Sequence, residues 1–196
     1  MSGVQVIAAA LGDQKVSRLV ARRDVLPAVR HLLRIAPPRP VPTGRAYWPI
    51  VMIKGEASVK LPFRRIDGIR VAGAVDAVTG RGGLVDVKLP GLEEREVGDE
   101  VVIGERYGED EVRKRWREFF RNYVVRKYRP TEIERLDVVD FQPCYLPYRV
   151  VEDGGRRYLV DELMKRVDPL DLLPGGVDSY FEDRPLVSSH GRAQPA

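Results

Sequence analysis

The chain carries the same short motifs twice and in the same order, and this repetition constrains the fold most strongly. The paired motifs are Tyr-x-Pro at residues 47–49 and 145–147, Val-Asp at 75–76 and 160–161, a second Val-Asp at 85–86 and 167–168, and Leu-Pro-Gly at 89–91 and 173–175. A basic residue lies five positions beyond the first Asp of each copy, and a helical pattern with an Arg-Pro step precedes each copy. The order predicts two copies of a helix followed by antiparallel strands.

We therefore predict an α+β protein of two tandem helix-plus-antiparallel-strand repeats packed as one pseudo-symmetric unit. The first repeat would cover residues 1–92 and the second residues 93–176, with 177–196 as a flexible tail. Each repeat offers one apolar helix face and a few strands, which it cannot bury well alone, so the two would close a core together. Whether the repeats form one domain or two is left open.

The strongest single element is a helix over residues 109–128. Its apolar side chains follow the 3.6-residue period, namely Val112, Trp116, Phe119, Phe120, Tyr123, Val124 and Tyr128. Acidic residues fill its first turn and basic residues its last, as the helix dipole favours, and Pro130 ends it. Other helices are predicted from Asp13 and from Asp24. Strands are predicted at residues 47–54, 58–63, 69–78, 84–87, 100–103, 136–141, 145–151 and 157–160.

Composition narrows the class of protein. With one cysteine, Cys144, and two histidines in 196 residues, an internal disulfide is impossible and a Cys/His zinc site is not expected. The net charge of +4 permits contact with nucleic acid or anionic lipid without demanding it. No apolar stretch approaches the ~20 residues that span a bilayer, and no signal peptide is recognised, so a cytoplasmic protein without a cofactor is expected.

Residues 75–80, Val-Asp-Ala-Val-Thr-Gly, resemble the closing strand and turn of PepSY-type domains. These are small helix-plus-antiparallel-sheet modules, often duplicated, found in protease propeptides and in cell-envelope proteins. The second copy reads Val-Asp-Glu-Leu-Met-Lys at residues 160–165 and lacks the Thr-Gly. The resemblance implies a non-catalytic binding or inhibitory module, with no catalytic residues to carry over.

The leading hypothesis is a non-enzymatic protein-interaction module that binds another protein or its own copy. Proline in a Tyr-x-Pro strand removes a ladder donor, which places that strand at a sheet edge or at a bulge. Such an edge either guards against pairing or docks a partner strand. The expected exposed anchors are Tyr47, Trp48, Tyr145 and Tyr148, because Tyr and Trp dominate binding hot spots.

A second hypothesis is a nucleic-acid-associated protein that uses the basic helix. Its candidate phosphate contacts are Arg113, Arg117, Arg121 and Lys127, and the interleaved aromatic residues could stack on bases. A solvated basic face over a buried aromatic stripe accounts for the same sequence.

A third hypothesis is an enzyme with a carboxylate site between the repeats, around Asp76 and Asp161. The same aspartates suit turns or caps equally well. Cys144 is predicted to be inert, because no histidine is placed to act as its base. No catalytic motif is recognised, and residues 80–83 favour a tight turn over a phosphate loop.

Overall fold

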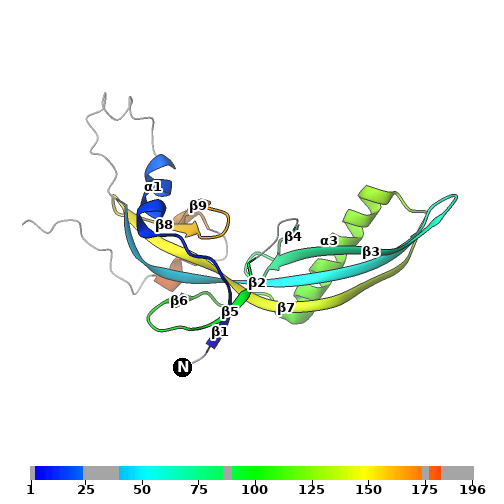
Figure 1. The fold of residues 1–196 in the computed structure, drawn as a ribbon, viewed down its shortest axis with the longest axis horizontal. Helices are drawn as coiled ribbons and strands as arrows, with labels where there is room; N and C mark the ends of the chain where they lie inside the picture. Colours follow the sequence, from blue (N-terminus) through cyan, green and yellow to red (C-terminus); the bar gives the residue numbers. More distant parts are fainter. Residues whose placement is uncertain (1–2, 24–39, 86–89, 174–176, 182–196) are drawn as a thin grey trace, which may run out of the picture. The chain divides into compact units, whose positions relative to one another are not determined.

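The computed structural model describes residues 3–23, 40–85, 90–173 and 177–181, and strands dominate them (Figure 1). The strands are β1 (Gly3–Ile7), β2 (Val41–Lys60), β3 (Arg65–Asp76), β4 (Gly82–Leu84), β5 (Leu92–Glu96), β6 (Val101–Val102), β7 (Glu132–Asp153), β8 (Arg156–Asp161) and β9 (Val167–Pro169). The helices are α1 (Asp13–Arg23), α3 (Glu109–Tyr128) and the short 3-10 helices η1 (Leu170–Leu172) and η2 (Val177–Phe181). The helix predicted from Asp24 and most of the predicted tail lie outside the described residues. None of the described helices is both long and apolar enough to cross a membrane.

The strands form a mixed nine-stranded sheet in the order β4-β3-β2-β7-β1-β5, in which β6 also pairs with β2, and β8 and β9 continue from β7. The β2–β3 and β7–β8 pairs are antiparallel, and the β1–β7 and β2–β6 pairs are parallel. The chain divides into two compact units, each assembled from separate stretches of sequence. Unit 1 contains Trp48–Glu96 and Gly104–Tyr145 with β1, and unit 2 contains Val97–Ile103, the stretch through α1 to Tyr47, and the chain from Leu146 onward.

The prediction of two tandem helix-plus-strand repeats is therefore wrong. β2 has 20 residues and β7 has 22, so most of the sheet lies in strands much longer than the short ones expected. In addition, α3 packs on β3 and β4, whereas α1 packs on β8 and β9. Each helix thus covers strands from the other half of the sequence, because burial of an apolar helix face depends on spatial neighbours and not on motif order.

The core of unit 1 is formed by α3 against the sheet. The helix predicted over residues 109–128 is confirmed at both ends. Its buried residues are Val112, Trp116, Phe120 and Val124, and they pack on residues of β2 and β3. Trp116 and Phe120 stack with ring centroids 5.8 Å apart. Burying four such side chains is worth roughly 1.5–3 kcal/mol each, so this face holds α3 in place.

Glycines of the sheet make room for these rings. A Cβ at Gly73 would lie 2.4 Å from Cζ3 of Trp116, and one at Gly55 would lie 2.5 Å from Cε1 of Phe120. Both distances are shorter than real Cβ contacts, so the rings rest directly on the strand backbone. An aromatic ring covering a glycine in a neighbouring element restores the burial that the glycine cannot supply itself.

Unit 2 has its own smaller core, in which Val16 and Val20 of α1 pack with Val151 of β7 and Val160 of β8. Asp13, in the first turn of α1, forms an ion pair with Arg149 of β7. The helix predicted from Asp13 is thus confirmed and held by both apolar and charged contacts.

The glycine under Trp116 gives the first prediction. Gly73→Ala should lower the free energy of unfolding by about 1–3 kcal/mol, because both the indole ring and the carbonyl oxygen of Gly83 must move. Gly83→Ala on the neighbouring strand is the matched control, since a Cβ there meets nothing within 4 Å. Urea unfolding followed by circular dichroism measures both, and equal losses would contradict the proposed role of Gly73.

Candidate functional site

The structure buries two of the four aromatic residues expected to anchor a partner. Tyr47 is 0% exposed and Trp48 5% exposed, so the expectation that they lie on the surface is wrong. The hydroxyl of Tyr47 donates to Glu100 at 2.8 Å, and Nε1 of Trp48 donates to Asp76 at 2.9 Å. The reason is that β2 is an interior strand of the sheet order and not an edge.

The other two aromatic candidates are half-buried and lie on β7. Tyr145 belongs to unit 1, where it is paired with Val6 of β1, and burial raises the pKa of its hydroxyl. Tyr148 belongs to unit 2, where it is paired with Asp161 of β8. The structure thus divides the four predicted anchors between two units.

Two of the four basic candidates on α3 are engaged within the protein. Arg113 forms an ion pair with Glu109 at 2.7 Å, and its guanidinium lies 4.0 Å from the ring centroid of Phe141. Nζ of Lys127 donates to the hydroxyl of Tyr123 at 2.7 Å, and this hydrogen bond is the main reason that the pKa of Lys127 is raised. Each of these two side chains thus already has a partner within the protein.

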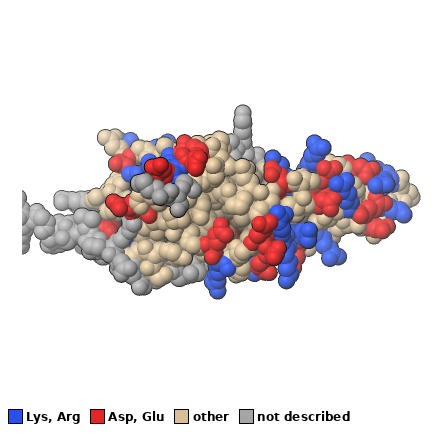
Figure 2. Space-filling view, turned by 90° about the horizontal axis from the view of Figure 1, so that it is seen from below, with Lys and Arg blue, Asp and Glu red and all other residues tan. Residues whose placement is uncertain are grey.

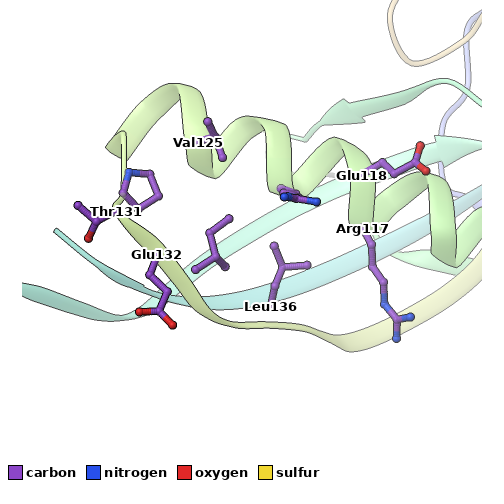
Figure 3. Close-up of a pocket in the computed structure, with 9 residues that line it drawn as sticks. Arg117, Glu118, Val125, Thr131, Glu132 and Leu136 are labelled. Carbon is purple, nitrogen blue, oxygen red and sulfur yellow. The ribbon is translucent and has the colours of Figure 1, made fainter.

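Arg117 and Arg121 differ from these two, because both are exposed and neither forms an ion pair with any other described residue. They lie on the wall of a groove of about 550 Å³ between α3 and the start of β7 (Figure 3). The groove is lined by Arg117, Glu118, Arg121, Val125, Pro130, Thr131, Glu132, Ile133 and Leu136.

The groove has an apolar floor and a basic rim. In Figure 3 the side chain of Leu136 rises from β7 toward α3, and Arg117 reaches from α3 toward β7. Glu118 and Glu132 point away from the gap. Val125 is 45% exposed and adds apolar surface to the lining of the groove. The acids therefore do not neutralise the two arginines inside the groove.

Beside the groove, β7 presents an open edge. In the sheet order β7 adjoins β2, and its pairings with other described strands begin at Tyr145, which pairs with Val6 of β1, and continue over Tyr148–Asp153 with β8. Among the described strands, residues 132–144 therefore have no second neighbour. An unpaired edge offers backbone N–H and C=O groups to another strand. Charged residues such as Glu132 and Asp137 stand along it and limit uncontrolled pairing.

Sequence reasoning named the two arginines but missed Val125 on the same helix and the residues of β7 that line the groove opposite them. Val125 could have been found in the sequence, because it is an apolar residue outside the buried stripe of the helix.

The two candidate carboxylates are occupied by turns. Oδ1 of Asp76 accepts from the backbone N–H groups of Val78 at 2.8 Å and Thr79 at 3.0 Å. Oδ1 of Asp161 accepts from Leu163 and Met164, each at 2.8 Å. Each aspartate therefore stabilises its own turn, one in unit 1 and one in unit 2.

The two turns also have the same pattern of backbone hydrogen bonds. The backbone N–H of Asp76 donates to the carbonyl oxygen of Arg81, and the backbone N–H of Asp161 donates to the carbonyl oxygen of Arg166. The residue after each aspartate donates to the proline carbonyl of the partner strand, Pro49 or Pro147. The fourth residue after each aspartate is left-handed, with φ of 71° at Gly80 and 57° at Lys165. The repeated motifs therefore encode one turn geometry used twice.

Neither acid–base chemistry nor metal binding gains support from the described residues. No group of three or more His, Cys, Asp or Glu side chains there could hold a metal ion. Acidic and basic side chains are interspersed over the charged face seen in Figure 2, so that face carries no large field of one sign.

Comparisons of the chain with protein-family models, with curated proteins and with solved structures give no match. The resemblance to PepSY-type domains stays a prediction.

Burial gives Asp161 a testable pH dependence. Desolvation raises its pKa above the ordinary value of 3.8, so the folded protein binds this proton more tightly than the unfolded chain does. Its contribution to stability is therefore fully present below the unfolded pKa and is lost as pH rises through the folded pKa. Relative to Asp161→Asn, the wild-type free energy of unfolding should fall between about pH 3 and about pH 7. Urea titrations at both pH values test this, and a constant difference would contradict it.

Cys144 should be chemically silent in the folded protein. It is 2% exposed, and burial raises the pKa of its thiol to about 11. Because the thiolate is the reactive form, iodoacetamide at about pH 8 should leave the folded protein unlabelled and label it fully in urea. Intact-protein mass spectrometry measures the result, and rapid labelling without denaturant would contradict it.

Proposed function

We propose that the protein is a non-enzymatic interaction module that binds an extended segment of another polypeptide in the groove between α3 and β7. The observation that carries the proposal is the combination of an apolar groove, two arginines without ion pairs among the described residues, and an open strand edge beside them. Backbone pairing with an edge supplies affinity, and pockets for alternate side chains supply specificity.

The wall of α3 suggests which segment fits. Arg117, Arg121 and Val125 follow one another at four-residue steps along the same flank of the helix. Four helical residues advance by about 6 Å, and two strand residues advance by about 6.6–6.8 Å. We therefore expect a bound strand with two acidic residues and then an apolar residue at alternate positions. Its carboxylates would lie opposite Arg117 and Arg121, and its apolar side chain opposite Val125. Carboxylates suit arginine because the guanidinium fork binds them through two hydrogen bonds.

Nucleic-acid binding through the same helix is the weaker alternative. It requires a continuous set of basic contacts, but Arg113 and Lys127 are held by intramolecular partners. A carboxylate enzyme has less support still, because Asp76 and Asp161 already accept two backbone hydrogen bonds each.

The proposal predicts selective loss of binding on charge reversal in the groove. The probe is a labelled extended peptide of the form Glu-x-Glu-x-Leu, with Gln-x-Gln-x-Leu as the neutral peptide, measured by fluorescence anisotropy. Arg121→Glu should weaken binding of the acidic peptide about tenfold, since a charged hydrogen bond is worth about 1.5–3 kcal/mol.

Arg126→Glu is the matched control, because Arg126 is exposed on the same helix but does not line the groove. It should change the affinity less than about twofold. Equal losses of affinity for both variants would show that the effect depends on the net charge of the protein and not on the groove. Failure of wild-type protein to prefer the acidic peptide over the neutral one would overturn the proposal.

A further inference from the structure

The turn of the β2–β3 hairpin exposes an aromatic side chain completely. Residues 61–64 form this turn, closed by a hydrogen bond of 2.7 Å from the N–H of Leu61 to the carbonyl oxygen of Arg64. Phe63 is 100% exposed at its tip, whereas the next most exposed large apolar residue of the described chain, Leu172, is 73% exposed. Pro62 is also exposed. An exposed apolar residue alone is ordinary, so its surroundings decide what it means.

Two exposed cations flank this tip. Lys60 and Arg64 flank the turn, both are exposed, and neither has an ion-pair partner among the described residues. Thr131 donates to the carbonyl oxygen of Lys60 through its N–H at 2.8 Å and through its hydroxyl at 2.9 Å. This contact fixes the end of α3 at the same extremity of unit 1, as Figure 1 shows, and brings Arg126 and Arg129 there.

Behind the tip the charges are paired. Arg65 forms ion pairs with Asp67 at 2.9 Å and with Glu134 at 2.8 Å. Lys54 pairs with Asp140 at 2.8 Å. The cations without partners are therefore confined to the end of the hairpin and do not continue along its strands.

This distribution discriminates between two anionic targets. A β-ribbon that wedges a side chain into a duplex needs further cations along the ribbon to contact phosphates on both sides. A bilayer surface is flat on this scale, so a single apolar protrusion surrounded by cations is sufficient to contact it. The paired charges behind the tip favour the bilayer.

We propose that the β2–β3 hairpin tip docks on an anionic lipid surface. Phe63 enters the interfacial region, and Lys60, Arg64, Arg126 and Arg129 face the lipid phosphates. Basic residues near such a surface add attraction that salt screens within about 10 Å at 0.1 M. None of these five residues lines the peptide groove, so either proposal can fail without the other.

The test uses the full chain and vesicles of phosphatidylcholine with or without about 30% phosphatidylserine, a fraction that gives a strongly negative surface. Co-sedimentation should show binding to the anionic vesicles alone, and binding should decrease as salt is raised. Phe63→Ser should lower the partition coefficient about tenfold, and Arg64→Gln about fivefold. Because Phe63 is fully exposed, its replacement removes no packing and the fold should persist.

Matched controls come from the same unit. Leu84→Ser removes an apolar residue that is 44% exposed away from the tip, and Arg70→Gln removes an exposed cation beside Glu56 on the hairpin strands. Neither should change partitioning more than about twofold. In Phe63→Trp, the added indole should shift its emission to shorter wavelength on anionic vesicles.

Three results would overturn the proposal. The first is absence of binding to anionic vesicles at low salt, and the second is equal loss in the tip and control variants. The third is displacement from vesicles by duplex DNA or RNA together with Phe63-dependent binding to that nucleic acid, which would assign the tip to nucleic acid instead.

Discussion

Unit 1 depends on the contact between the aromatic face of α3 and the glycines beneath it. Trp116 lies over Gly73 and Phe120 over Gly55, close enough that no side chain could stand between ring and strand. This fixes both the height and the rotation of the helix above the sheet. When both rings are packed on the glycines, the rotation of α3 is fixed. Arg117 and Arg121, four residues apart on its flank, must then lie beside the start of β7. The groove is thus a consequence of core packing.

The sequence predicts α3 to the residue because several independent signals coincide there. An apolar stripe, acids in the first turn, bases in the last and Pro130 all indicate the same element. Strand lengths could not be predicted in the same way. The predicted strands stop at residues 54 and 141 and begin again at residues 58 and 145, whereas β2 and β7 run through both gaps without interruption. At Gly55 the reason is tertiary, since the absence of a side chain leaves space for the ring of Phe120, on a helix more than 50 residues away in the sequence.

The candidate site was only half predictable for a related reason. Arg117 and Arg121 could be named because an exposed helix flank is visible in the 3.6-residue period. Burial of Tyr47 and Trp48 could not be predicted, because it depends on which strands border β2. Residues 46–51 are buried consecutively, so this part of the strand is covered on both faces. A strand signal alone does not distinguish one covered face from two, and the proline within it pointed to an edge.

The repeated motifs were real, but they recorded a local requirement and not a repeated domain. In both turns an aspartate accepts two backbone N–H groups, and the proline carbonyl of the neighbouring strand accepts a third. Gly80 holds the left-handed position in one turn and Lys165 holds it in the other, at a steric cost that glycine avoids. The missing Thr-Gly of the second copy therefore did not abolish the turn, because the aspartate and the proline carbonyl supply most of its hydrogen bonds. The second strands of the β2–β3 and β7–β8 hairpins end in the same kind of turn. They therefore need the same few residues, whichever helices cover their strands.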